Sequence, residues 1–153
     1  MCPTFESLDI IERIDGGKVD VSLFRAEDPN TGHPFVIKVF KDDEGGSSKY
    51  FKAESSIINI NHINVISILN SCTDFAMGCD GVTIEASALL MEYAPYGDFF
   101  DLVLTDKIIK PEDDALIRTY FHQLINGVEA IHSSQVYHLD IKLENVLLGS
   151  DFQ

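Results

Sequence analysis

Short apolar runs alternate with turn residues along the first forty positions of the chain. Runs at residues 8–14, 21–26 and 35–40 are separated by Gly16-Gly17 and by the segment 28–32, which reads Asp-Pro-Asn-Thr-Gly. Such a cluster of Pro, Asn and Gly is a strong turn signal. The third run is rich in β-branched and aromatic residues, as strands are. The pattern predicts three antiparallel strands joined by tight turns.

The apolar spacing then changes to that of a helix. After Ser47-Ser48, a plausible N-cap region, Tyr50, Ala53, Ile57 and Ile60 recur at three- and four-residue intervals and predict a helix over 49–60. Two more strands are expected at 65–69 and 88–91, with a glycine-containing loop at 76–81 between them. Five strands and one helix therefore occupy the first 94 residues.

A long helix is predicted over residues 111–133. Pro111 and the three acidic residues after it are typical of a helix start, since Pro suits the first turn and carboxylates favour the positive end of the helix dipole. One apolar stripe follows the helix: Ile117, Phe121, Leu124, Val128 and Ile131. Such a stripe needs a partner surface, and little chain follows to supply one. The fold class predicted is α+β, a five-stranded antiparallel sheet with one helix followed by further helices.

Composition narrows the class of partner. The chain has 25 acidic and 11 basic residues among 153, a formal net charge of −14. An acidic surface repels phosphate backbones and anionic headgroups, so neither nucleic acid nor a membrane is expected as a partner. Basic peptides would be attracted, although a solvated acidic face is the simpler explanation of the charge. The three cysteines lack paired spacing, the N-terminus does not resemble a signal peptide, and no apolar stretch reaches ~18 residues. These features predict a cytoplasmic or nuclear protein.

The segment 137–148, Tyr-His-Leu-Asp-Ile-Lys-Leu-Glu-Asn-Val-Leu-Leu, carries the most specific chemistry. Its HLDIKLEN core resembles the catalytic loop of protein kinases, H-R-D-L-K-P-E-N, with Asp140, Lys142 and Asn145 at the family's positions. The resemblance implies that Asp140 orients the substrate hydroxyl and accepts its proton. It implies that Lys142 offsets charge on the transferred phosphoryl group and that Asn145 is a ligand of Mg²⁺. A Lys two residues after the catalytic Asp, as at Lys142, is typical of serine/threonine-type members.

Upstream elements follow in the family's order. Phe-Val-Ile-Lys at 35–38 resembles the V-A-I-K strand, which makes Lys38 the residue that grips the α- and β-phosphates of ATP. Glu54 on the next helix is then the expected ion-pair partner of Lys38. Taken alone, each would be an ordinary charged residue of a strand or helix. Glu54 precedes His62 by eight residues, one fewer than the family pattern leads us to expect.

Residues 90–98, Leu-Met-Glu-Tyr-Ala-Pro-Tyr-Gly-Asp, resemble the hinge between the two kinase lobes. The resemblance implies that the backbone of Glu92 and Ala94 binds adenine, that Met91 lines the pocket and that Asp98 lies near the ribose. Without the other elements, the same segment would be a strand that runs into a turn. The resemblance spans residues 8–149 and implies a partial kinase domain over 1–153. Residues 8–94 would form the N-terminal lobe and the start of the hinge, and 95–153 the rest.

The glycine-rich loop departs from the family pattern. Aligned on Val21, G-x-G-x-x-G-x-V becomes residues 14–21, in which Ile14 and Val19 stand where glycines are usual and only the middle glycine, Gly16, remains. Side chains obstruct the close approach of backbone N–H groups to phosphate. Ile14, Gly16 and Val21 are nevertheless the residues that the resemblance assigns to nucleotide binding here.

Three further departures bear on activity. Val36 replaces the usual Ala of the adenine roof, and Leu139 replaces the Arg that pairs with a phosphorylated activation loop, so control by that route is not expected. In the family a D-F-G motif follows, and its Asp holds Mg²⁺. The chain stops before such a motif, which predicts a fragment that does not catalyse phosphoryl transfer alone.

Three functions stay open at this point. The first is an ATP- and Mg²⁺-dependent protein serine/threonine kinase, of which this chain is a fragment, with a protein substrate of basic character. The second is a pseudokinase or truncated module that binds a nucleotide or a protein without catalysis. The third is an unrelated α+β domain. The exposed apolar stripe of the long helix further predicts self-association.

Overall fold

The protein, represented by a computed structural model, forms two compact units. The structure describes residues 4–14, 20–42, 46–79 and 82–152. One unit comprises residues 1–59 and 67–93, and the other comprises residues 60–66 and 94–153. Each unit is described by itself below.

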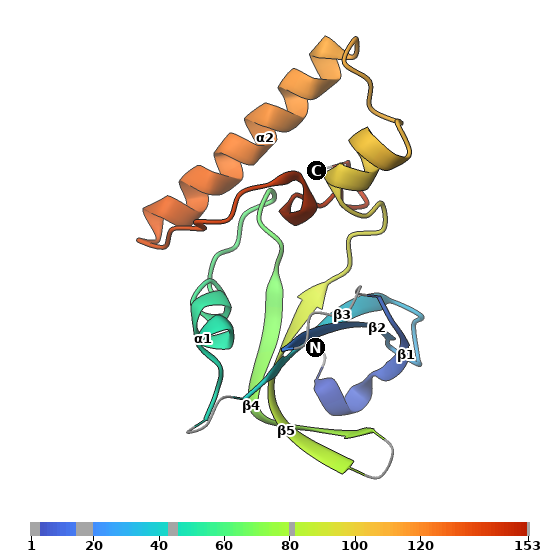
Figure 1. The fold of residues 1–153 in the computed structure, drawn as a ribbon, viewed down its shortest axis with the longest axis vertical. Coiled ribbons are helices and arrows are strands. Elements are labelled where there is room, and N and C mark those ends of the chain that lie inside the picture. The colour runs from blue at the N-terminus through green and yellow to red at the C-terminus, as the bar shows by residue number, and fades with distance from the viewer. Residues whose placement is uncertain (1–3, 15–19, 43–45, 80–81, 153) are drawn as a thin grey trace. The chain divides into compact units, whose positions relative to one another are not determined.

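The first unit is built on a five-stranded antiparallel sheet of order β1-β2-β3-β5-β4 (Figure 1). A 3-10 turn, η1 (Phe5–Ser7), precedes the strands, which are β1 (Asp9–Arg13), β2 (Val21–Glu27), β3 (Pro34–Lys41), β4 (Ile68–Cys79) and β5 (Val82–Glu92). The predicted three-stranded meander and the five-stranded antiparallel sheet are both confirmed. The sequential strands β1 to β3 need only short turns, which the Asp-Pro-Asn-Thr-Gly segment supplies between β2 and β3.

The central strand β3 is buried on both faces of the sheet. Phe35, Ile37 and Val39 point to one side, where they pack with Leu90 and other residues of β5. Because side chains alternate along a strand, Lys38 belongs to the opposite face, with Phe40. This second face holds a separate cluster of Phe40, Phe51, Ile68 and Leu89. Burial on both faces explains why β3 is apolar from Phe35 to Phe40 except at Lys38.

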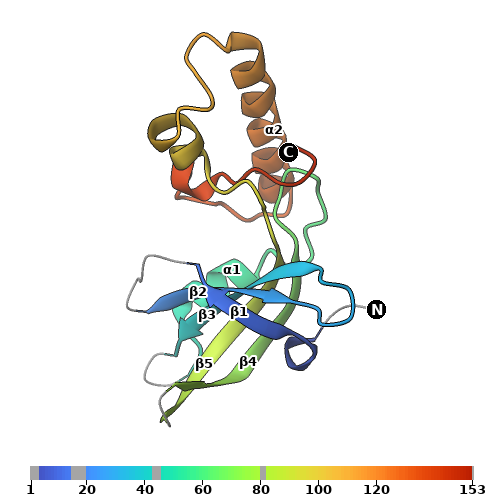
Figure 2. The same ribbon diagram turned by 90° about the vertical axis from the view of Figure 1, so that its right-hand side faces the viewer.

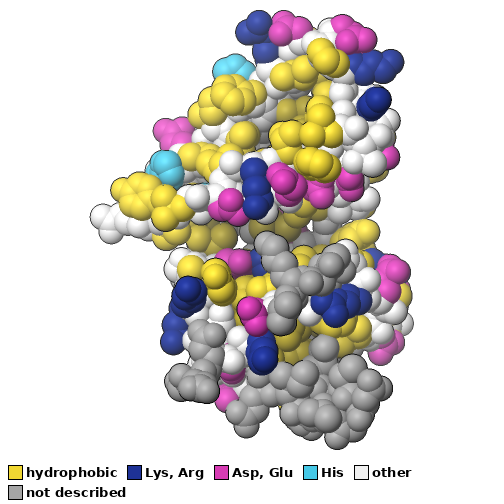
Figure 3. All heavy atoms as spheres, viewed as in Figure 1, with side chains coloured by type: hydrophobic (Ala, Val, Ile, Leu, Met, Phe, Trp, Pro, Cys, Tyr) yellow, Lys and Arg dark blue, Asp and Glu magenta, His cyan; other side chains and the backbone are white. Residues whose placement is uncertain are grey.

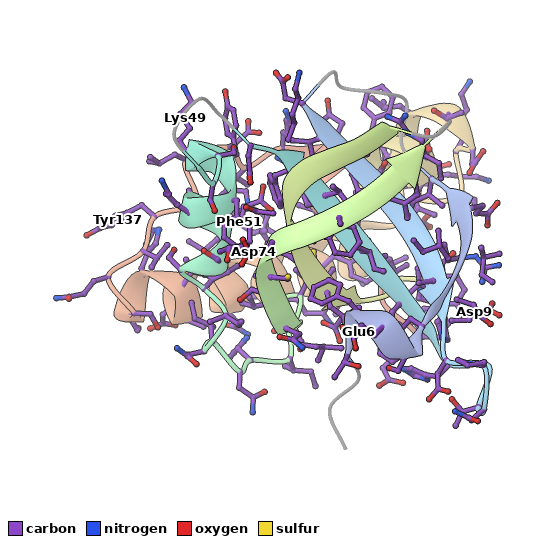
Figure 4. The ribbon with its side chains drawn as sticks, turned by 90° about the horizontal axis from the view of Figure 1, so that it is seen from below. Glu6, Asp9, Lys49, Phe51, Asp74 and Tyr137 are labelled. Atoms are coloured by element: carbon purple, nitrogen blue, oxygen red, sulfur yellow. The ribbon has the colours of Figure 1, made fainter. Side chains whose placement is uncertain are left out.

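Helix α1 (Lys49–Ser55) lies against this second face of the sheet (Figure 2). Phe51 points from α1 toward the strands (Figure 4) and its ring meets that of Phe40 edge-on, with 5.8 Å between centroids. The helix is shorter than the predicted 49–60. The hydroxyls of Ser55 and Ser56 donate to the carbonyls of Lys52 and Ala53. Such bonds compete with helical ones and favour an end at this point.

The predicted loop at 76–81 is wrong over most of its length. β4 continues to Cys79 and pairs with β5 down to the Cys79–Val82 position, with a register shift between Cys72 and Phe75. A glycine in a strand weakens pairing without preventing it when the neighbouring strand runs alongside. Tertiary pairing therefore overrides the local turn signal of Gly78.

The second unit contains a short π-helical turn η2 (Asp101–Thr105), the long helix α2 (Asp114–Ser133) and a 3-10 turn η3 (Leu143–Asn145). Its core is small and consists of Phe99, Leu102, Ile109 and Leu148. Tyr120 of α2 packs edge-on against Phe99 with 5.0 Å between ring centroids. This core ties α2 to the segment that follows η3. Among the helices of the described residues, none combines the length and hydropathy of a membrane span.

Helix α2 begins later than the predicted residue 111. Its N-cap is Asp113, whose Oδ2 accepts a hydrogen bond from the Lys110 N–H at 2.9 Å rather than from the helix. The carboxylate thereby closes a turn over 110–113, and Pro111 lies in that turn instead of in the first helical turn. The predicted end of the helix at Ser133 is confirmed.

The segment 60–66 packs on α2 inside the second unit. A Cβ added to Gly127 would lie 2.4 Å from the backbone oxygen of Asn64, so only glycine permits this approach. Val65 is buried beside it. The side-chain nitrogen of Asn64 is buried without a hydrogen-bond partner in the part of the chain that the structure describes.

The apolar stripe of α2 is covered only at its C-terminal end. Ile131 is buried and Leu124 and Val128 are half-buried, whereas Ile117 and Phe121 are exposed, Phe121 to 59%. Figure 3 shows hydrophobic side chains (yellow) open to solvent on the unit that contains α2. The surface expected to lack a partner is therefore the N-terminal half of the helix.

Candidate functional site

Lys38 and Glu54 form an ion pair within the first unit. β3 presents Lys38 on the sheet face that α1 covers, and Glu54 stands on the adjacent helix. The ammonium Nζ lies 2.7 Å from Oε1 and 2.6 Å from Oε2 of the carboxylate. Nζ also lies 5.4 Å from the centroid of the Phe40 ring, a cation–π contact. The side chain of Lys38 keeps 22% of its surface exposed.

The other predicted nucleotide-binding residues of the first unit lie on the same sheet. Val36 pairs with Met91 across β3 and β5, as Lys38 pairs with Leu89, so their side chains share the face that carries the ion pair. Val21 contributes to the apolar cluster of that face. Val36 is only 8% exposed, and it therefore packs as a wall residue whose larger side chain reduces the space on that face.

The end of β5 is fastened to the start of β4. The Glu92 N–H donates to the Ser67 carbonyl at 3.1 Å, and the Glu92 carboxylate accepts from the Ser67 N–H at 2.7 Å. The backbone N–H of Glu92 is thus already engaged and is not free for the predicted contact with adenine.

Ile14 directly follows β1. Its N–H donates to the Leu23 carbonyl at 2.9 Å and its side chain is exposed. The backbone at the predicted loop start is therefore engaged in pairing with β2. Gly16 lies outside the described residues.

Ala94 and Asp98 belong to the second unit. The Ala94 carbonyl accepts from the Gly97 N–H at 3.4 Å, and the positive φ of Gly97, 73°, suits a turn that glycine favours. Asp98 forms a β-bridge with Leu147, and its Oδ1 accepts from the Asp101 N–H at 2.9 Å. One carboxylate oxygen of Asp98 is thus occupied at the start of η2.

A short antiparallel pairing links this turn to the segment after η3. The Phe99 N–H donates to the Val146 carbonyl at 2.9 Å, and the Leu148 N–H donates to the Gly97 carbonyl at 2.9 Å. Leu148 is buried in the core of the unit. These bonds anchor one end of the segment that carries Asp140, Lys142 and Asn145.

Asp140, Lys142 and Asn145 meet around one carboxylate. The Asn145 side-chain nitrogen donates to the Asp140 carbonyl at 2.7 Å and to Asp140 Oδ2 at 2.9 Å. The ammonium of Lys142 lies 3.2 Å from the same Oδ2. The 3-10 turn η3 makes this possible because it folds Asn145 back toward Asp140. Within the described residues, both hydrogen bonds of the Asn145 amide use its nitrogen, so its oxygen remains for a cation.

The electrostatics keep Asp140 ionised. Hydrogen bonds from Lys142 and then Asn145 lower the pKa of the Asp140 carboxyl below its ordinary value, and the positive charge of Lys142 acts in the same direction. Slight burial opposes them. A carboxylate that stays charged at neutral pH can accept a hydrogen bond from a hydroxyl.

The backbone before Asp140 is strained. Leu139 has a φ of 57°, in the left-handed region, and its side chain is 93% exposed. A non-glycine residue there is held by its surroundings, and such strain clusters at functional sites. The Asp140 N–H donates to His138 Nδ1 at 3.3 Å. The interaction of His138 with Asp140 was not predicted from the sequence, although the His-x-Asp spacing could have indicated it.

Known proteins resemble the chain over most of its length. A family model described as "Protein kinase domain" matches residues 14–153. The chain is 36% identical over 129 residues to "CBL-interacting protein kinase 32" of Oryza sativa, covering 82% of this chain and 27% of that protein. It is 30% identical over 146 residues to "Probable serine/threonine-protein kinase RTK1" of Saccharomyces cerevisiae, covering 95% of this chain and 20% of that protein.

A human relative, "Myosin light chain kinase 3", is 28% identical over 137 residues, which are 89% of this chain and 15% of that protein. The chain spans less than a third of the length of each of these relatives.

Proposed function

Because the chain belongs to the protein kinase domain family, we propose that it carries the phosphoryl-transfer residues of an ATP-dependent protein serine/threonine kinase. The reaction would move the γ-phosphoryl group of Mg-ATP to a hydroxyl of a protein substrate. The observation that carries this proposal is the arrangement of Asp140, Lys142 and Asn145 around one carboxylate oxygen.

Each of these groups has a defined task. The ionised Asp140 accepts a hydrogen bond from the substrate hydroxyl, orients it and takes its proton. Lys142 keeps a positive charge beside the place where negative charge develops. Asn145 holds Asp140 through its amide nitrogen and offers its amide oxygen to a cation. Mg-ATP, when bound, supplies the phosphoryl group and the metal charge that neutralises it.

The first unit supports nucleotide binding independently. The ammonium of Lys38 is directed by both oxygens of Glu54, and the Lys38 side chain remains partly exposed. An ammonium held in this way attracts the α- and β-phosphates without having to reorganise. Met91 and Val36 add an apolar surface on the same face of the sheet, as an adenine ring requires.

A second candidate function is a kinase-like module that binds a nucleotide or a protein without catalysis. Two observations favour it: Ile14 places an exposed isoleucine where the family has glycine, and Val36 narrows the adenine face. The chain covers less than a third of the length of these relatives, so the activity of a whole protein is part of what is proposed.

The test is peptide phosphorylation by the full protein and its Asp140→Asn variant. We expect the variant to lose at least about a hundredfold in kcat, because general-base catalysis contributes roughly 10²–10⁴, while Mg-ADP binding is retained. Glu144→Gln removes a neighbouring exposed carboxylate and is the matched control, expected to keep activity.

The substrates should be serine-containing peptides of basic and of acidic sequence, since the net charge of −14 favours the basic ones. Equal turnover by Asp140→Asn and the original protein would refute the assignment. Nucleotide binding without turnover by the original protein would favour the second function.

A further inference from the structure

Ser87 is a fully buried polar residue on β5. Its side chain has no exposed surface, yet it stands on the apolar sheet face that α1 covers, paired with Phe40 of β3. Its Oγ lies 2.7 Å from Oδ1 of Asp42 and 2.9 Å from Oγ of Ser47. A hydroxyl has one proton, so Ser87 donates to the carboxylate and accepts from the Ser47 hydroxyl. Both hydrogen-bonding roles of this buried hydroxyl are used.

The two partners flank the link between β3 and α1. Asp42 directly follows the last residue of β3, and Ser47 directly precedes Ser48, the N-cap of α1. The cap is itself formed, since the Ser48 hydroxyl accepts from the Tyr50 N–H at 3.1 Å. One hydroxyl on β5 therefore fastens both ends of the connection that carries the chain from Lys38 to Glu54. We call Asp42, Ser47 and Ser87 the Ser87 clamp.

We propose that Ser87 is a positioning residue for the Lys38–Glu54 ion pair. Ser87 contacts neither member of the pair and acts through the link. The part of this inference that concerns nucleotide binding by the ion pair rests on the proposed function. The geometry of the ion pair in the nucleotide-free protein does not depend on that function.

Helix α1 cannot hold its own position. Its seven residues are too few for a helix that is stable alone. Packing of Phe51 on the sheet supplies attraction, but apolar contacts are non-directional and tolerate sliding along a flat face. Hydrogen bonds at 2.7 and 2.9 Å from a rigid strand restrict the position of the helix start. A carboxylate can contact an ammonium with both oxygens, as Glu54 does, only if the helix is held at that distance.

Ser87→Ala removes the hydroxyl without adding bulk and leaves both ends of the link unfastened. The first measurement is made without nucleotide, on the side-chain carbon resonance of the Glu54 carboxylate, assigned by its loss in Glu54→Gln. We expect this resonance to move toward that of exposed glutamates in Ser87→Ala. Ile37→Val, which removes one methyl group from the opposite face of the sheet, is the matched control and should leave the resonance in place.

The second measurement is Mg-ADP affinity in a double-mutant cycle. We expect Ser87→Ala to weaken binding about three- to tenfold, which is the net effect of losing one ordinary intramolecular hydrogen bond. The same change in a Glu54→Gln background should have less than about a twofold effect, since the pair is then already broken. A purely structural role would lower affinity equally in both backgrounds.

The inference is overturned if Ser87→Ala lowers the unfolding temperature as Ile37→Val does but leaves the Glu54 resonance unchanged. It is also overturned if both backgrounds lose affinity equally. If the original protein binds no Mg-ADP, the proposed function fails, and the Glu54 resonance still decides on the clamp. Should Ser87→Ala not fold, Ser47→Ala removes a single bond of the clamp and serves for both measurements.

Discussion

Gly127 should be the position in α2 where alanine destabilises the protein. In an ordinary helix interior, Gly→Ala stabilises by about 1 kcal/mol, because alanine loses less backbone entropy and is the best helix former. At residue 127, however, the added Cβ would lie 2.4 Å from the backbone oxygen of Asn64 and 3.2 Å from its carbonyl carbon. The shorter distance is ~1 Å below ordinary van der Waals contact.

The steric cost exceeds the gain in helix propensity. The opposing atom belongs to the backbone, so no side-chain rotation can make room, and Val65 next to it is buried. The segment 60–66 must therefore move as a whole. Overpacking of this kind costs about 1–3 kcal/mol, and a rigid backbone partner places the cost at the upper end. After subtracting the propensity gain, we expect Gly127→Ala to lower the free energy of unfolding by roughly 2 kcal/mol.

The assay is thermal unfolding followed by circular dichroism. For a chain of this size, 1 kcal/mol corresponds to roughly 2–4 °C, so the midpoint should fall by about 4–8 °C. Asn126→Ala is the matched control, because it changes the neighbouring exposed residue of α2 and should be neutral or slightly stabilising. A rise in the midpoint for Gly127→Ala, as in an isolated helix, would refute the packing of segment 60–66 on α2.

Two further results are expected. Lys142→Met should raise the pKa of Asp140 toward 3.8, because it removes the largest cause of the depression and leaves the hydrogen bond from Asn145. A carbon-detected NMR titration that finds the pKa unmoved would contradict this. The pKa of Asp140 is lower in the folded state than in the unfolded state. Any stability that Asp140 contributes is therefore present above pH 3.8 and is lost as the pH falls through the folded-state pKa. Finally, exposed Phe121 predicts self-association through α2. Light scattering at rising concentration should show association that Phe121→Glu reduces, and a strictly monomeric original protein would contradict the prediction.

Much of the fold could be predicted from the sequence because it depends on residues that are close together along the chain. The strands β1, β2 and β3 alternate with strong turn residues, and the end of α2 follows from its apolar period. The grouping of Asp140, Lys142 and Asn145 is local too, since five positions and one 3-10 turn separate its ends. Residues so close in sequence have few ways to be arranged, so the spacing alone carries most of the geometry.

Boundaries were predicted less well because competing hydrogen bonds decide them. Asp113 bonds back to Lys110 and delays the start of α2, and the hydroxyls of Ser55 and Ser56 accompany the early end of α1. Gly78 carries a turn signal but lies in β4 because β5 pairs alongside it. In each case hydrogen bonds that the apolar pattern does not contain decide where the element begins or ends.

Only the tertiary structure decided which distant residues meet. Ser87 closes the link between Asp42 and Ser47 because β5 packs beside the end of β3 and the start of α1. Position 127 requires a glycine because the backbone of Asn64 packs against α2. An isolated serine in a strand or glycine in a helix carries no such signal. The sequence by itself determined which segments are strands or helices, from the spacing of their apolar residues, and which side chains meet within a single turn. Both depend only on neighbours along the chain. Contacts across the sheet and between helix and loop depend on packing, which brings together residues that no local pattern connects.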